Sequence, residues 1–205
     1  MIPDTQFVNG NIAEAKQKTD RGWGIMEQSS VALIIIVVIA IVLGSYYMLR
    51  GRTNVATETS NIQTIITSSQ GLLKSVNGYN FTSSTKMTGT LIQMGGVPKT
   101  MTISGTASSG SAKLYNSWGG DVTIAPSATA GTGFNNGFTV TYDKVPLDAC
   151  VQLSAQISKG GTANVITVNG TAHSDGIVTT EEASSQCKAD SGSTGTNKLI
   201  FTVNG

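Results

Sequence analysis

Residues 20–44 read DRGWGIMEQSSVALIIIVVIAIVLG, and this stretch determines how the rest of the chain is interpreted. Its centre, from Val31 to Leu43, is apolar at every position, a length that is short for a membrane span. Taken from Trp23 to Leu49, the segment is long enough to cross a bilayer as a helix. Aromatic residues stand near both ends, where they suit the two membrane interfaces. We therefore expect a transmembrane helix.

A secretory signal peptide is the first alternative, and it requires small residues at a cleavage site directly after the apolar run. The residues that follow, GSYYMLRGRTN, are bulky and basic and make a poor site. A polar segment of 22 residues comes before the run and ends in Asp20-Arg21-Gly22. Trp23 follows, and Glu27 is the fifth residue counted from it. This order of glycine, apolar residue and carboxylate resembles the processing site of type IV prepilins.

The resemblance implies that a prepilin peptidase cuts after Gly22 on the cytoplasmic side, which makes Trp23 the first residue of the mature chain. Most members begin with Phe or Met, so Trp23 departs from the family pattern, and its N-methylation is implied by the resemblance alone. The family's glutamate falls on Glu27, whose implied partner is the free α-amino group of a neighbouring subunit. A lone carboxylate at the edge of an apolar helix costs about 2.5–3.5 kcal/mol. Glu27 therefore either pairs in this way or extends to the lipid headgroups.

Beyond Arg52 apolar residues continue at helical spacing as far as Val76. We expect one helix from Trp23 to about Val76; the alternative is two helices broken near Gly44 or Gly51. Short alternating runs then indicate strands at Met101–Thr106, Asp121–Ala125, Gly137–Asp143, Asn164–Asn169 and Lys198–Val203, and helices at Thr85–Met94, Leu147–Ile157 and before Cys187. This order predicts the α+β class, with a long N-terminal α-helix packed against an antiparallel β-sheet head domain, as in the type IV pilin fold.

The composition argues against several classes of function. Net charge is +1 with 12% charged residues and no basic run, so nothing indicates a nucleic-acid partner. His173 is the only histidine, which leaves no set of histidines for a metal site or a choice of triads, and we expect it on a solvated loop. Glu181-Glu182 is expected at the N-terminal face of a helix. We expect no enzyme activity, no metal and no cofactor.

The two cysteines, Cys150 and Cys187, have a meaning that depends on the compartment. They form one disulfide in an exported chain and remain free thiols in a cytosolic one. The resemblance implies an external head and therefore the disulfide. A long leader and the segment Asn116–Val122, NSWGGDV, are similar to the type IVb branch. Within it, the chain resembles the thin-pilus, PilS-like major pilins of conjugative plasmids and enterobacteria.

The resemblance thus implies the major subunit of a type IVb pilus, an inner-membrane precursor that becomes part of an extracellular filament. Its expected parts are a leader (1–22), an apolar assembly half-helix (23–50), an amphipathic half-helix (51–76) and a head (77–205). Expected partners are identical subunits, a prepilin peptidase, the inner-membrane assembly machinery and, before assembly, the membrane. Two alternatives remain open: a pseudopilin of type II secretion, and a membrane-anchored periplasmic binding module that never polymerises.

Overall fold

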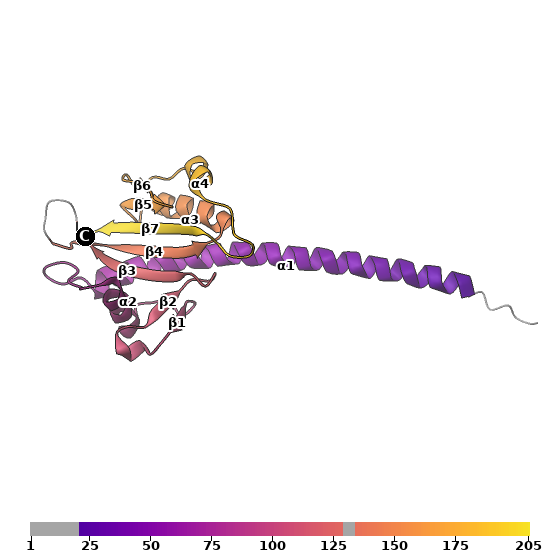
Figure 1. The fold of residues 1–205 in the computed structure, drawn as a ribbon, viewed down its shortest axis with the longest axis horizontal. Helices are drawn as coiled ribbons and strands as arrows, with labels where there is room; N and C mark the ends of the chain where they lie inside the picture. The colour runs from indigo at the N-terminus through magenta and orange to yellow at the C-terminus, as the bar shows by residue number, and fades with distance from the viewer. Residues whose placement is uncertain (1–20, 129–133) are drawn as a thin grey trace, which may run out of the picture. The chain divides into compact units, whose positions relative to one another are not determined.

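The computed structural model describes residues 21–128 and 134–205 (Figure 1). They fall into two units, divided between Tyr47 and Met48. Helix α1 (Arg21–Leu72) contributes to both units and is helical through Gly44 and Gly51, so the alternative of two broken helices is wrong. The helix ends four residues before the predicted Val76. Most of the expected leader, residues 1–20, lies outside the described part of the chain.

The second unit is built on one antiparallel sheet. Its strands are β1 (Thr102–Ser104), β2 (Lys113–Tyr115), β3 (Asp121–Ser127), β4 (Gly137–Val145), β5 (Val165–Val168), β6 (Thr171–His173) and β7 (Asn197–Asn204). They lie in the order β1-β2-β3-β4-β7-β5-β6, and each neighbouring pair is antiparallel. The last strand of the chain therefore sits between β4 and β5 (Figure 1). All five predicted strands are present, and the α+β prediction is confirmed.

The sequence interpretation missed β2 and β6, which have three residues each and are too short to show an alternating pattern. The predicted strand Met101–Thr106 is reduced to the three residues of β1. Sheet-edge strands are often this short, because a long open edge would pair with other chains. Both edges of this sheet, β1 and β6, follow that rule.

Local capping residues explain where the helices of this unit begin and end. They are α2 (Ser84–Gln93), α3 (Leu147–Gly160) and α4 (Thr180–Gln186), with a 3₁₀ turn η1 at Ala107–Ser109. Ser83 is the N-cap of helix α2, and its hydroxyl accepts a hydrogen bond from the Lys86 N–H at 3.2 Å. Gly161 is the C-cap of helix α3, in the left-handed conformation that favours glycine. All three predicted helices are present: both bounds of α2 are shifted by one residue, α3 ends three residues later than predicted, and α4 lies before Cys187 as expected.

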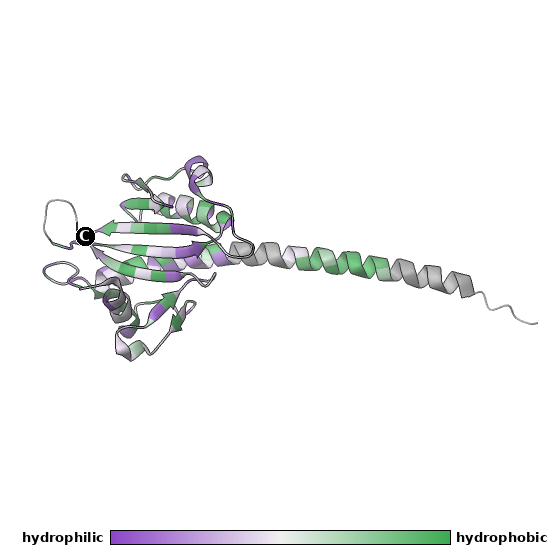
Figure 2. Ribbon diagram, viewed as in Figure 1, coloured by the Kyte–Doolittle hydropathy of each residue, from purple (hydrophilic) through white to green (hydrophobic). Residues whose placement is uncertain are grey.

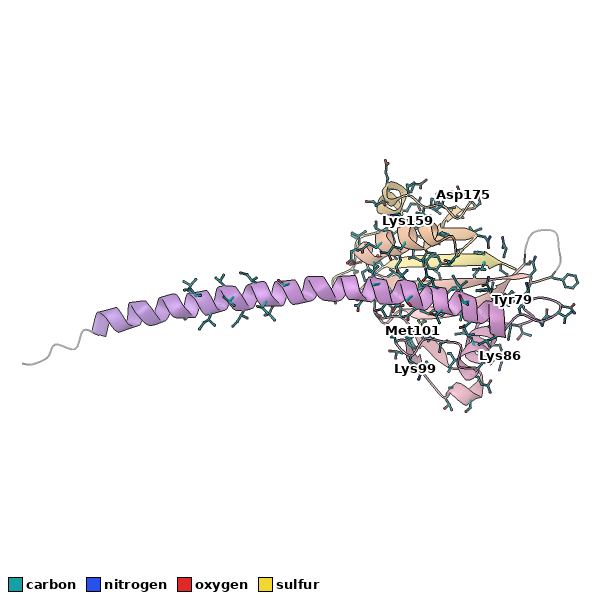
Figure 3. All side chains as sticks on the ribbon, turned by 180° about the vertical axis from the view of Figure 1, so that it is seen from behind. Tyr79, Lys86, Lys99, Met101, Lys159 and Asp175 are labelled. Atoms are coloured by element: carbon teal, nitrogen blue, oxygen red, sulfur yellow. A yellow bond between two sulfur atoms is a disulfide. The ribbon has the colours of Figure 1, made fainter. Side chains whose placement is uncertain are left out.

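One face of the sheet forms the core of the second unit. Along β4 the side chains of Phe138, Val140 and Tyr142 are fully buried, whereas the threonines between them are half-exposed. The buried face packs against apolar residues of α1 and α3, including Ile62 and Leu153. Figure 3 shows this part of α1 in front of the sheet, seen from behind. The expected packing of the long helix on one sheet face is therefore present.

Candidate assembly helix and disulfide-bounded region

The residues predicted to direct processing and assembly lie at the beginning of helix α1. Gly22, Trp23 and Glu27 all have helical backbone within Arg21–Leu72. Their side chains lie outside the part that the structure describes, so the contacts of Glu27 and the cut after Gly22 stay predictions.

The described side chains that follow form an exposed apolar surface on α1. The ten large apolar residues from Leu33 to Leu43 are each between 48% and 65% exposed. Figure 2 shows this part of the helix as a continuous hydrophobic band. A helix that is hydrophobic on all sides is stable only when other apolar surface covers it. Among the residues with described positions, no helix combines the length and apolarity needed to cross a membrane.

The two cysteines form a disulfide that links α3 to the end of α4. Cys150 is fully buried on α3, and Cys187 is the C-cap of α4, with 6.0 Å between their Cα atoms. The pairing implied by the resemblance is confirmed. Helix α4 begins with a capping box, in which Glu182 accepts a hydrogen bond from the Thr179 N–H at 2.9 Å. This bond, together with the one from the Thr179 hydroxyl, lowers the pKa of Glu182.

Two asparagines tie the segment that follows α4 to the sheet. Asn197, fully buried at the start of β7, donates to the Lys188 carbonyl at 2.9 Å and accepts from the Lys188 N–H at 2.6 Å. Asn169 donates to the Asn197 side-chain oxygen at 2.7 Å and to the Gln186 carbonyl at 2.8 Å. The sequence predicted Asn169 only as the end of a strand and gave no role to Asn197, so their part in holding the segment after the disulfide was missed.

The Trp-Gly-Gly segment forms a tight turn between β2 and β3. The side-chain oxygen of Asn116 accepts from the N–H groups of Trp118 at 3.0 Å and Gly120 at 2.9 Å. Its amide nitrogen donates to the Asp143 carbonyl on β4 at 2.8 Å. A Cβ at Gly120 would lie 1.8 Å from that carbonyl oxygen, so the turn requires glycine there.

Gly120→Ala should lower the free energy of unfolding by about 3 kcal/mol or more, because β3 and β4 must separate to admit the methyl group. Gly119→Ala is the matched control. Its Cβ meets no atom within 4 Å, and only its left-handed backbone, at φ 73°, opposes the change, at a cost of about 1 kcal/mol. Urea unfolding of the two variants measures the difference. Equal losses would mean that β3 and β4 adjust freely at this turn.

The same turn binds a buried carboxyl group on α1. Glu58 is fully buried and accepts from the Ser117 N–H at 2.7 Å and from the Ser117 hydroxyl. Asn61, one turn further along α1, donates to its other oxygen at 3.2 Å. Burial raises the pKa of Tyr142 well above its usual value, and the charge of Glu58 raises it further. Glu58 therefore joins the turn to the long helix.

The structure adds little reactive chemistry. No group of three or more His, Cys, Asp or Glu side chains within the described residues is placed to hold a metal ion.

The prediction of His173 on a solvated loop is wrong: it is half-buried on β6, with its Nε2 at 3.0 Å from the Gln186 Oε1. The reason is the turn of Asn169 (φ 50°) and Gly170 (φ 95°), which folds β6 back onto β5 as a hairpin.

Comparison with known proteins gives results that agree with this geometry. The family model described as PilS N terminal matches residues 52–204. The crystal structure of a type IVb pilin from Salmonella typhi is 54% identical, covers 73% of this chain and 99% of its own, and superposes with a TM-score of 0.65.

The NMR structure of the type IVb pilin PilS from Salmonella typhi is also 54% identical, and it covers 74% of this chain and 96% of its own, with a TM-score of 0.52. No protein in the curated set matches the chain.

Proposed function

Since this chain belongs to the PilS family of type IVb pilins, we propose that it is the major structural subunit of a type IVb pilus. The filament would serve attachment, aggregation or conjugative mating-pair contact. The observation that carries the proposal is the exposed apolar surface of α1 between Leu33 and Leu43, in a chain 54% identical to a type IVb pilin. Covering the part of each of these side chains that is still exposed contributes about 1 kcal/mol per side chain, which is enough to hold copies of this chain together.

The proposed precursor resides in the inner membrane and is cut there by a prepilin peptidase after Gly22, so that residues 1–22 are the leader. Residues 23–50 then form the core of the filament, residues 51–76 join that core to the head, and residues 77–205 form the head at the surface. The inner-membrane assembly machinery adds each new subunit.

Glu27 is proposed as the residue that sets the register between subunits. The cut creates a free α-amino group on Trp23, and this group is the partner of Glu27 in the next subunit. Removed from water, such an ion pair adds little net stability, but an unpaired carboxylate is costly. The pair therefore selects one docking position among many along an apolar helix that has few other polar features.

Family membership favours this function over the two alternatives. A type II secretion pseudopilin would share the processing site and Glu27, but this chain is 54% identical to a pilin over 73% of its length. An anchored periplasmic module that never polymerises would have no use for the cut after Gly22. In that case a variant blocked in processing would function like the parent chain.

The test is the intact mass and N-terminal sequence of the protein in filaments sheared from the producing cell. The expected result is an abundant polymer whose subunits begin Trp23-Gly24-Ile25-Met26-Glu27, with the mass also reporting methylation of Trp23. Subunits that begin at Met1, or a cut after the apolar run without filaments, would overturn the proposal.

A further inference from the structure

The turn that follows helix α1 carries an Asn-Gly pair at the surface of the second unit. Ser75 and Gly78 close this turn, because the Ser75 N–H donates to the Gly78 carbonyl at 3.0 Å and the Gly78 N–H donates to the Ser75 carbonyl at 3.1 Å. Val76, at its tip, is fully exposed, and Asn77 is exposed beside it. Figure 3 shows Tyr79, the next residue after the turn, near the C-terminal end of α1. The tip of the turn therefore lies outside the core.

The amide side chain of Asn77 is available for reaction with the backbone nitrogen of Gly78. Within the residues that the structure describes, this side chain forms no hydrogen bond. The Gly78 nitrogen becomes available when one hydrogen bond breaks, the one that its N–H donates to the Ser75 carbonyl. This opening uncovers no apolar side chain of the core, because Val76 is already exposed. Local openings at exposed turns require little free energy.

The fold holds the same dipeptide firmly at Asn169-Gly170. The side-chain nitrogen of Asn169 donates to the Gln186 carbonyl at 2.8 Å and to the Asn197 side-chain oxygen at 2.7 Å. The side-chain oxygen of Asn169 accepts from the Lys198 N–H at 2.9 Å. The amide cannot turn toward the Gly170 nitrogen until these bonds break, and each of them stabilises the present arrangement.

Two further Asn-Gly pairs are held in the sheet. Gly137, which follows Asn136, begins β4 and is the register partner of Asn204 on β7. Asn204 precedes Gly205, and its N–H donates to the Asn164 side-chain oxygen at 2.8 Å. Attack at either pair requires the two strands to move apart at this pairing. One more Asn-Gly pair lies outside the described residues.

We propose that Asn77 deamidates spontaneously in the folded chain and that the fold protects Asn169, independently of the role of α1 in assembly. The Gly78 nitrogen attacks the side-chain carbonyl carbon of Asn77 and closes a succinimide ring. The amide nitrogen of Asn77 leaves as ammonia, which carries away the Gly78 N–H proton. Water then opens the ring at either carbonyl and leaves aspartate or isoaspartate at position 77. Glycine favours this attack because it has no Cβ to crowd its nitrogen.

The product adds a negative charge to a surface depression that Asn77 lines together with Lys74 and Phe134. The new carboxylate opposes the positive field of Lys74 at this end of α1. Because the released ammonia does not return, the charge accumulates as the chain ages. In the proposed filament, old and new subunits therefore differ at this surface.

The test incubates the full chain in detergent at neutral pH in heavy-oxygen water and follows each Asn-Gly peptide by mass spectrometry. Heavy oxygen enters only when the ring opens, which separates deamidation during incubation from deamidation during later digestion in ordinary water. We expect Asn77 to convert at least about tenfold faster than Asn169, because the hydrogen bonds of the Asn169 amide oppose the attack. In urea, where the fold is lost, the two rates should become similar.

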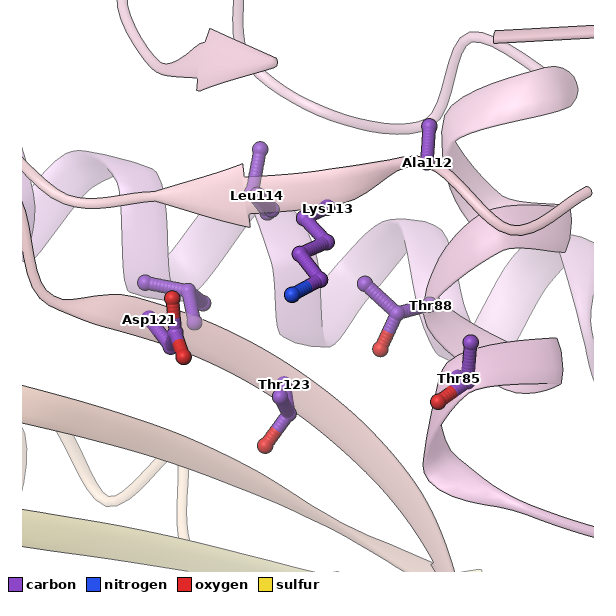
Figure 4. A pocket seen from close by; sticks show the side chains of 8 residues that line it. Thr85, Thr88, Ala112, Lys113, Leu114, Asp121 and Thr123 are labelled. Atoms are coloured by element: carbon purple, nitrogen blue, oxygen red, sulfur yellow. The ribbon is translucent and has the colours of Figure 1, made fainter. Parts of the chain in front are cut away.

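Asn77→Gln is the matched control, because the longer side chain keeps the amide but closes a ring far more slowly. It should remove the signal from this peptide, which also contains Asn80. Lys113→Gln is the charge standard for isoelectric focusing, because Lys113 is exposed on β2 (Figure 4) and its loss lowers the net charge by the same amount as deamidation. The aged parent chain should gain a band that focuses with this standard.

The proposal is overturned if Asn77 converts no faster than Asn169 in the folded chain. It is also overturned if the difference between the two rates persists in urea, since the fold would then not be its cause. Heavy-oxygen incorporation that survives Asn77→Gln would place the reaction at another residue and would equally reject it.

Discussion

Glu27→Ala should remove pili from the cell surface while the precursor is still cut after Gly22. In the proposed function, the cut depends on residues at the leader junction, whereas docking depends on the carboxylate of Glu27 meeting the α-amino group that the cut creates. Losing one member of a buried ion pair leaves the other unpaired, at a cost of about 3–5 kcal/mol. A cost of this size at every subunit contact lowers the docking constant by about a hundredfold or more. The yield of sheared filaments should therefore fall below detection.

A separate measurement of processing distinguishes a loss of assembly from a loss of the cut in this variant. N-terminal sequencing of the membrane fraction should find the variant beginning at Trp23, in the same amount as the parent chain. Glu27→Gln is the matched control, because it preserves size and hydrogen bonding and removes only the charge, and it should yield few filaments. Normal filament yields from Glu27→Ala would show that α1 finds its register without this pair, and the proposed role of Glu27 would be wrong.

Removing the disulfide has the second largest expected effect. Cys150 and Cys187 are separated by 37 residues, and closing a loop of this length contributes about 4 kcal/mol in the chain-entropy model. The double variant Cys150→Ser, Cys187→Ser should therefore melt about 10 °C below the parent. The measurement is thermal unfolding, followed by circular dichroism, of a fragment of residues 52–205, which comprises the head and the half-helix packed on it.

The head should still fold without the disulfide, because Asn197 and Asn169 hold the segment after α4 by separate hydrogen bonds. Native circular dichroism below the melting temperature would confirm this. The parent head in reducing buffer is the control, and it should melt at the temperature of the double variant. Identical melting under oxidising and reducing conditions would contradict a stabilising role for the disulfide.

Local sequence patterns predicted the elements whose signals lie within a few residues of each other. The alternation of Phe138, Val140 and Tyr142 identified the buried face of β4 because side chains alternate across a strand. The two helices predicted with bounds, Thr85–Met94 and Leu147–Ile157, were likewise located to within three residues. The prediction missed β2 and β6, whose pairing is set by neighbours in the sheet and not by their own composition.

The residues of the candidate site were likewise predicted from the sequence where they are neighbours in the chain, but not where only the fold brings them together. Glycine at position 22, the carboxylate of Glu27 and the apolar run after it are neighbours in the chain, so their resemblance to a prepilin processing site is visible from the sequence. Cys150 and Cys187 were identified as a possible pair, but only the fold brings their Cα atoms to 6.0 Å.

The sequence by itself therefore determined the long apolar helix, the α+β class and the family resemblance, since each rests on residue type at short spacing. Only the tertiary structure decided that Glu58 is bound by Ser117, 59 residues away, and that Asn197 holds Lys188 beside the disulfide. The physical reason is that a buried polar group is stable only where a partner reaches it, and the fold of the whole chain determines which partner does so.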